Sequence, residues 1–413
     1  MILFLLQIGV VMAASQALGR LFRRLGQPPV IGEMIAGIVL GPSLLGWLAP
    51  HLHDALFPAA SLAPLGLIGQ LGLVFYMFLV GATLDLDHLR DNRGVALVTS
   101  LTSIALPFVA GAALAVWLRP QLAAPGASTL PFALFFGVCL SITAFPVLAR
   151  IVTDSGMLKT PLGAKLGTMA ISCAAVDDVS AWLILAAVLG FVHASGQEHS
   201  FSTTLVRFAI YVVGMILLRR IVTPMVQARD DVDSHKELPL LLLAAVASAI
   251  ATEWIGIHAV FGAFFAGAVM PKRPALLEYV RATVEPFNTV VLLPLFFALT
   301  GLRTQIGLVL DPQSLFFTAL IMATAVAGKW LGATLAARAM GLAAPEANAL
   351  GILMNTRGLV ELVVLNIGYE VGLLPQRVFS MLVTMAILTT LMTTPLLRWT
   401  YLNKLERHGR PVA

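Results

Sequence analysis

Two adjacent aspartates inside an apolar segment have the clearest potential chemistry in this chain. Asp177 and Asp178 lie within residues 169–182, where most neighbours are small or apolar. Burial and repulsion between neighbouring carboxylates both favour the protonated acid, so such a group can hold either a proton or a metal cation. This choice is the minimum chemistry for exchanging cations against protons. The alternative is a pair that only joins helices by hydrogen bonds, which the cost of burying two acids disfavours.

The geometry of a helix separates the two carboxylates. Adjacent helical residues point about 100° apart, so one acid can pair with a fixed cation while the other opens to a cavity. Lys329, well inside another apolar segment, supplies the obvious cation, because a buried ammonium needs a partner. The alternative is a lysine whose side chain extends to the membrane surface.

A second charged pair, Arg357 and Glu361, lies four residues apart in a later apolar segment. This spacing allows an ion pair within one helix, and such a pair with no further role is the alternative interpretation. Asn355, Thr356 and Gly358 place polar and flexible residues beside it. Together these residues predict a helix that breaks in the middle of the segment.

Residues 141–150 carry a similar interruption. Pro146 lacks a backbone N–H in mid-helix and frees a carbonyl near residue 142, which can unwind one turn. Thr143 and the exposed backbone oxygens can then help to ligate an alkali cation, because such ions prefer hard oxygen ligands. An ordinary proline kink is the alternative.

The composition shows what kind of protein must position these residues. Of the 413 residues, 59% are hydrophobic and 11% are charged, compared with about 25% charged in soluble domains. This excludes a soluble fold, a disordered chain and a collagen-like chain, and the two cysteines exclude a disulfide scaffold. What remains is an all-α polytopic membrane protein. The apolar start lacks a basic region and a cleavage motif, so a retained helix is expected there instead of a signal peptide.

Apolar stretches of roughly 20 residues predict about 13 transmembrane helices. Twenty of the 26 Lys and Arg lie in the odd-to-even loops and the C-terminal segment, and four lie on the opposite side. This bias predicts an N-terminus outside and a C-terminus in the cytoplasm. It attributes the net charge of +5 to topology and contact with anionic membrane lipid, not to nucleic acid. The expected spans are 2–19, 28–48, 64–84, 95–118, 130–152, 161–193, 203–227, 236–254, 257–271, 286–302, 314–340, 345–370 and 376–398.

The two predicted breaks fall in the fifth and twelfth spans. If the seventh span is a linker, each broken helix is the fifth member of a six-helix half, and the two halves enter the membrane from opposite sides. The sequence therefore predicts two six-helix inverted-topology repeats with broken helices. Such an arrangement is typical of a transporter whose binding site lies near the middle of the bilayer.

Ordered motifs from the second to the twelfth span extend this interpretation. These motifs are 26–33 (GQPPVIGE), 37–42 (GIVLGP), 78–81 (FLVG), 141–150 (SITAFPVLAR), 174–178 (AAVDD), 295–297 (LFF), 328–329 (GK) and 355–358 (NTRG). Each motif alone is modest, but their order along the whole membrane region is specific. Through them the chain resembles the monovalent cation:proton antiporter superfamily, most of all its bacterial potassium or sodium/proton antiporters and plant cation/proton exchangers.

The resemblance implies a homodimer in which a core domain moves against a static dimer domain. The broken helices would cross beside the paired acids within the core. The implied parts are dimer-domain helices 1–3 at 1–84 and 8–10 at 236–304, core helices 4–6 at 95–194 and 11–13 at 314–398, a linker helix at 203–227 and a short cytoplasmic tail at 399–413.

The resemblance also assigns roles to the residues singled out above. Asp178 is the implied cation and proton carrier, with Asp177 as a second acid paired with Lys329. Thr143 would line the site. A polar patch on the crossing helix is the implied role of Asn355, Arg357 and Glu361.

The implied function is exchange of Na+ or K+ for protons by alternating access in a bacterial inner membrane, without enzymatic activity or a cofactor. No Gly-rich dinucleotide fingerprint is found, so no nucleotide-binding domain is expected in this chain. A cation channel or an ion-coupled regulatory membrane subunit is the alternative. An intramembrane aspartic protease is disfavoured, because its two acids must face each other from separate helices.

Two departures from the family pattern concern the transported ion and the proton count. Plant exchangers often carry Asn-Asp where this chain has Asp177 and Asp178, and a double acid with a lysine resembles electrogenic sodium/proton members. Arg357, in contrast, is a feature of electroneutral relatives. The resemblance therefore leaves the choice between Na+ and K+ and the stoichiometry open.

Overall fold

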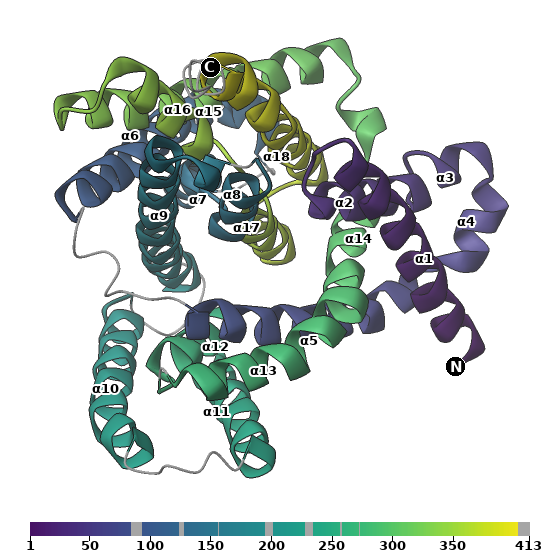
Figure 1. The fold of residues 1–413 in the computed structure, drawn as a ribbon. Helices are drawn as coiled ribbons and strands as arrows, with labels where there is room; N and C mark the ends of the chain where they lie inside the picture. Colours follow the sequence, from purple (N-terminus) through teal and green to yellow (C-terminus); the bar gives the residue numbers. More distant parts are fainter. Residues whose placement is uncertain are drawn as a thin grey trace, which may run out of the picture. The chain divides into compact units, whose positions relative to one another are not determined.

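The computed structural model describes residues 1–83, 93–123, 128–155, 157–194, 201–227, 234–256, 258–271 and 273–403. Within these ranges the chain is almost entirely helical and contains no β-strand (Figure 1). The predicted all-α class is therefore confirmed. The predicted span end at residue 84 and the tail beyond residue 403 lie outside the described residues.

The helices follow one another with short connections. Up to residue 194 they are α1 (Ile2–Arg24), α2 (Pro29–Leu40), α3 (Leu45–Leu48), α4 (Pro50–Leu56), α5 (Ala59–Thr83), α6 (Arg93–Leu122), α7 (Thr129–Ser141), α8 (Phe145–Asp154), the 3-10 turn η1 (Met157–Lys159) and α9 (Pro161–Ala194). From residue 201 they are α10 (Phe201–Gln227), α11 (Ser234–Ile255), α12 (Ala259–Val269), α13 (Pro274–Phe287), η2 (Asn288–Leu292), α14 (Leu293–Arg303), η3 (Ile306–Leu308), α15 (Pro312–Ala339), α16 (Ala344–Met354), α17 (Leu359–Glu370), α18 (Gln376–Leu397) and η4 (Arg398–Leu402).

Every predicted span overlaps at least one of these helices. Ten stretches of the described chain are long and apolar enough to cross a membrane, and the bent pair α16 and α17 provides an eleventh. The predicted seventh span is the helix α10, which is not one of these stretches, and the predicted ninth span is the short apolar helix α12. The number of thirteen crossings and the inverted repeat therefore stay predictions. The short helix α3 lies at the end of the predicted second span, whereas the short helix α4, between the second and third spans, was not predicted.

The chain forms two compact units. The first consists of Met1–Ala13, Asp54–Asp85 and Ala186–Leu299. Inside it, α5 and α12 approach each other at two glycines. A Cβ atom on Gly81 would collide with the Phe264 carbonyl oxygen, and a Cβ atom on Gly267 would collide with the Phe78 carbonyl oxygen. Small residues at such contacts let helix backbones approach closely, as membrane helices require for packing.

The second unit consists of Ala14–His53, Leu86–Leu185 and Thr300–Ala413. Inside it, α15 packs against α6, α16 and α18, and α6 packs against α7. Buried apolar side chains from α8, α9, α15, α16 and α18 form one core. A Cβ atom on Gly328 would meet Pro107 of α6, so α15 runs close to α6 at the position before Lys329. The second unit thus holds the helices that carry both aspartates and the lysine.

The close contact of α5 and α12 leads to a stability prediction. Gly267→Ala should lower the free energy of unfolding by roughly 1–3 kcal/mol, because overpacking forces the two backbones apart. Gly214→Ala is the matched control, since an added Cβ at this exposed position of α10 meets nothing within 4 Å. The control should leave stability unchanged or raise it slightly. Thermal unfolding of both variants in detergent checks this, and a wild-type melting temperature for Gly267→Ala would contradict the close packing.

Candidate functional site

Two interrupted helices meet inside the second unit. Helix α7 ends at Ser141 and α8 begins at Phe145, and residues 142–144 between them are non-helical. Helix α16 ends at Met354 and α17 begins at Leu359, with a bend of 40° between them. Pro146 lies in the first turn of α8, where a residue without an N–H costs no helical hydrogen bond. The interruptions lie at the two positions that the sequence indicates.

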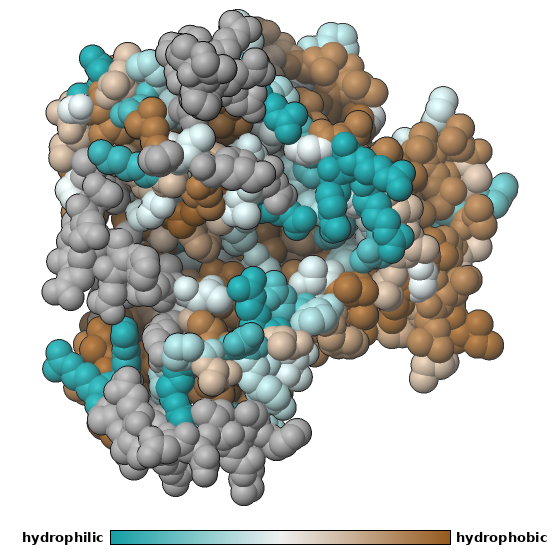
Figure 2. Space-filling view, in the orientation of Figure 1, coloured by the Kyte–Doolittle hydropathy of each residue, from teal (hydrophilic) through white to brown (hydrophobic). Residues whose placement is uncertain are grey.

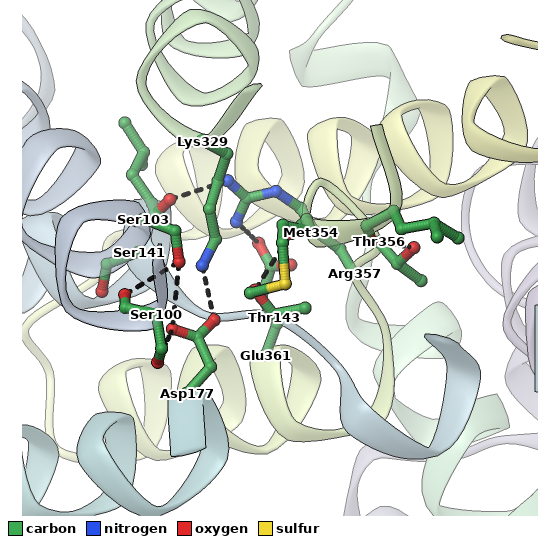
Figure 3. Close-up of polar contacts among 12 residues, drawn as sticks. Ser100, Ser103, Ser141, Thr143, Asp177, Lys329, Met354, Thr356, Arg357 and Glu361 are labelled. Carbon is green, nitrogen blue, oxygen red and sulfur yellow. Dashed lines mark hydrogen bonds and ion pairs between the residues drawn. The ribbon is translucent and has the colours of Figure 1, made fainter. Parts of the chain in front are cut away.

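The two breaks are joined to each other by hydrogen bonds. The Ala144 N–H donates to the Thr356 carbonyl oxygen at 2.9 Å. The Thr143 hydroxyl donates to the Met354 carbonyl oxygen, also at 2.9 Å (Figure 3). Both threonines are fully buried. Backbone groups released by the breaks therefore find partners on the opposite chain segment, as the membrane interior demands.

Arg357 closes the end of α7. Its guanidinium donates to the carbonyl oxygens of Cys139 at 2.9 Å and Leu140 at 2.7 Å, in the last turn of that helix. The final carbonyls of a helix have no intrahelical partner and carry partial negative charge, so a cation there is stabilising. The same guanidinium lies 3.1 Å from Glu361 (Figure 3). The ion pair predicted by the i,i+4 spacing is thus formed, and the arginine also binds the carbonyl end of a second helix, α7.

The backbone of the second break is held by α18. The Thr390 hydroxyl accepts a hydrogen bond from the Arg357 N–H at 3.0 Å and donates one to the Arg357 carbonyl oxygen at 2.7 Å. Asn355, at the start of this break, is buried, and its side-chain oxygen has no hydrogen-bond partner among the described residues. Its oxygen is therefore a further ligand that the crossing can offer.

Asp177 forms a buried ion pair with Lys329. The Lys329 Nζ atom lies 2.6 Å from the Asp177 Oδ2 atom, and both side chains are fully buried. The hydroxyls of Ser100 and Ser103 lie 3.4 and 3.3 Å from the other oxygen, Oδ1 (Figure 3). The first carboxylate is therefore compensated on both of its oxygens.

Ser100 and Ser103 are residues that the sequence analysis missed. They lie three residues apart on α6, which places both on one face of that helix. Polar residues at this spacing in an apolar span are a weak signal, because serines also bond to their own helix backbone. Ser103 does so as well, donating to the Ser100 carbonyl oxygen at 2.9 Å.

Asp178 has a different environment. It is 3% exposed, and neither of its carboxylate oxygens has a hydrogen-bond partner among the described residues. Its electrostatic surroundings are the Asp177 carboxylate, the Lys329 ammonium and the backbone amide of Phe145. A bare carboxylate without partners is very costly to bury, so this group needs a proton or a cation.

Within the described ranges, no three His, Cys, Asp or Glu side chains gather as they would around a resident metal ion. The adjacent carboxylates of Asp177 and Asp178 are the candidates for holding a cation. Hard oxygen donors of this kind suit alkali ions.

Comparison with known proteins places this site in context. The family model described as "Sodium/hydrogen exchanger, transmembrane" matches residues 10–399. The chain is 44% identical to the Na(+)/H(+) antiporter NhaS4 of Synechocystis over 400 residues, which cover 96% of each chain. It is 40% identical to Cation/H(+) antiporter 17 of Arabidopsis thaliana, over 97% of this chain and 48% of that protein.

More distant relatives show the same pattern. The chain is 30% identical to K(+)/H(+) antiporter 1 of Saccharomyces cerevisiae, over 97% of this chain and 46% of that protein. It thus spans about half the length of the plant and yeast relatives. The solved structure of the sodium proton antiporter MjNhaP1 from Methanocaldococcus jannaschii matches with a TM-score of 0.70 over 98% of both chains. At 13% identity that match shows a common fold.

The buried ion pair leads to a prediction about stability. Lys329→Met removes the ammonium and leaves Asp177 with two serine hydroxyls only. The free energy of unfolding should fall by about 3 kcal/mol, because a buried carboxylate loses its counter-charge. Thermal unfolding in detergent measures the difference.

Two further variants control this experiment. Adding Asp177→Asn to Lys329→Met removes the stranded charge and should restore part of the stability. Arg281→Gln breaks an exposed ion pair with Glu285, whose side chains are 61% and 41% exposed, and should change the melting temperature little. If Lys329→Met lowered the melting temperature as little as Arg281→Gln does, the buried pair would have no role in stability.

Proposed function

Because the chain belongs to the sodium/hydrogen exchanger family, we propose that it exchanges Na+ or K+ for protons across a membrane. The names of its relatives support both cations, since they include Na(+)/H(+) and K(+)/H(+) antiporters. The fold shared with a sodium proton antiporter agrees with this proposal. Na+ and K+ are thus both candidate substrates.

One observation supports this function most directly: the unpartnered carboxylate of Asp178, buried beside an ion pair at the crossing of two broken helices. A buried carboxylate in this state must be neutralised. A proton can do this, and so can an alkali cation, but the two compete for the same oxygens. Entry of the cation from one side then releases a proton, and protonation from the other side releases the cation.

Alternating access follows from the same free-energy cost of burying a charged carboxylate. A charged carboxylate is costly to move past an apolar barrier, so reorientation is favourable only when Asp178 carries a proton or a cation. In this proposal an empty site stays where it is, which prevents uncoupled leak. Exchange is then obligatory: the site returns only with the other ion.

The crossing supplies the remaining ligands. The backbone oxygens of the two breaks and the Asn355 side-chain oxygen lie in the same buried region as Thr143. In this structure the Thr143 hydroxyl donates its hydrogen to Met354, which leaves its oxygen lone pairs as acceptors. Thr143 can thus line the cation site without breaking that bond.

Asp177 and Lys329 act as the second, coupled pair. When a cation binds between the two acids, Asp177 turns part of its charge to the cation, and Lys329, without its partner, releases a proton in addition to the one from Asp178. When the cation leaves, Asp178 and Lys329 each take up one proton, so two protons move per cation. This proton count makes each cycle move net charge across the membrane.

The larger arrangement remains as the family resemblance implies. We expect a homodimer in a bacterial inner membrane, with the N-terminus outside and the C-terminus in the cytoplasm. The moving core contains α9, which carries both acids, and α15, which carries Lys329. The same core contains both broken helices, so the whole cation site travels as one body.

Asp178→Asn tests the carrier role. Asn has nearly the same shape but cannot hold a titrating proton, so exchange should be abolished while the melting temperature stays unchanged or rises. The assay is dye-monitored proton movement in proteoliposomes after addition of NaCl or KCl. Glu278→Gln, which removes an exposed acid on α13, is the matched control and should retain exchange. Exchange by Asp178→Asn would move the carrier role to another group, and cation flux without proton movement would indicate a channel.

The proton count is tested separately by the membrane potential. If two protons move per cation, Na+-driven exchange in proteoliposomes should speed up or slow down according to the sign of an imposed potential. Asp177→Asn should reduce this dependence, because the second proton site is lost. A rate that does not respond to the potential in the wild-type protein would argue for one proton per cation.

A further inference from the structure

The second compact unit contains a half-open cavity of about 330 Å³ that takes no part in the aspartate site. It lies where the end of α1, the start of α2 and the ends of α8 and α18 come together. Polar lining residues are Arg23, Gln27, Arg150, Ser155, Thr394 and Arg398. Figure 2 shows hydrophilic residues gathered over the region of α1 and α2.

Three arginines from three different helices give this cavity its charge. Arg23 comes from α1, Arg150 from α8, and Arg398 follows the last residue of α18. One half-buried acid, Glu33, lies within electrostatic range of Arg23 and Arg150. It offsets part of the charge, and a net positive charge remains. Charges of one sign in a concave site favour an anionic ligand.

The backbone at the cavity is shaped to bring these groups together. Gly26 ends the connection after α1 with a φ of 71°, a left-handed conformation that glycine adopts without strain. The guanidinium of Arg398 lies directly beside this glycine. The Gln27 side-chain amide donates to the Leu391 carbonyl oxygen of α18 at 3.2 Å, which ties the same turn to that helix.

An unsatisfied hydroxyl also points to a ligand. Thr394 is 7% exposed and lines the cavity, yet its hydroxyl oxygen has no hydrogen-bond partner among the described residues. Buried polar atoms are nearly always paired, so a bound molecule that accepts a hydrogen bond is the natural partner for this hydroxyl.

We propose that this cavity binds the phosphate group of an anionic molecule. Guanidinium groups bind phosphate oxygens through paired hydrogen bonds, and a tetrahedral phosphate offers enough acceptors for three arginines and a threonine hydroxyl. The volume exceeds that of one phosphate and leaves room for an attached group. Phospholipid headgroups and soluble phosphate esters share this chemistry.

Direct binding to the purified full chain in detergent tests the proposal with two probes. The first is a short-chain phosphatidic acid, with the matching phosphatidylcholine as the zwitterionic comparison, and the second is glycerol phosphate. Binding is measured by calorimetry and by the shift in melting temperature. Saturable binding of phosphatidic acid alone identifies a lipid site, and binding of both probes identifies a site for the phosphate group itself.

Substitutions locate the binding. Arg150→Gln and Arg398→Gln should each weaken it by about tenfold, because each removes a charge-assisted contact. Arg24→Gln is the matched control, since Arg24 follows Arg23 on α1 but does not line the cavity. It should leave affinity nearly unchanged. Equal losses in all three variants would show binding to general surface charge and overturn the proposal, as would absence of saturable binding by either probe.

A fourth variant protects the test against unfolding. Thr394→Val replaces a hydroxyl that has no protein partner with a methyl group of similar size, so it should fold at least as well as the wild type. It should weaken probe binding by roughly threefold to tenfold. A folded Thr394→Val protein with wild-type affinity would remove the hydroxyl from the site and, together with unchanged arginine variants, refute the proposal.

Discussion

A carboxylate buried in a membrane protein needs a cation, a proton or several hydrogen-bond donors, because the apolar interior cannot solvate its charge. The two neighbouring aspartates of α9 meet this requirement in different ways. Asp177 has Lys329 at 2.6 Å and two serine hydroxyls at 3.3 and 3.4 Å. Asp178 has no hydrogen-bond partner among the described residues. One turn of helix thus holds a carboxylate compensated by protein groups beside one for which we propose an exchangeable ion as the compensating group.

The same requirement acts on the backbone. Breaking a helix inside a membrane releases N–H and carbonyl groups, which persist only where protein groups satisfy them. Here each break helps to satisfy the other through Ala144 and Thr356, while Arg357 binds the last carbonyls of α7. Non-helical backbone is therefore stable beside the aspartates, where its oxygens are available to a cation. The contacts that hold the two helix breaks in place are thus the same contacts that leave backbone oxygens beside the aspartates.

Sequence reasoning reached the parts of this site that local rules govern. The cost of burying charge singled out Asp177, Asp178 and Lys329, and the backbone limits of proline predicted an interruption beside Pro146. It did not reach contacts that exist only after helices cross. The serines of α6 and the carbonyls of Cys139 and Leu140 gain their partners from helices more than 70 residues away in sequence. The short helix α4 was missed because it is not long enough to form an apolar span.

The two buried cationic side chains, Arg357 and Lys329, have different partners. This difference suits Arg357 to a structural role and Lys329 to a role in exchange. Arg357 is bound by two backbone carbonyls and Glu361, and carbonyls cannot be protonated or exchanged. Lys329 has a carboxylate partner, and that carboxylate adjoins the unpartnered acid. In the exchange that we propose, an ion that reaches Asp178 acts on the lysine pair and leaves the arginine contacts intact, so that charge can change without loss of the crossing that holds the site.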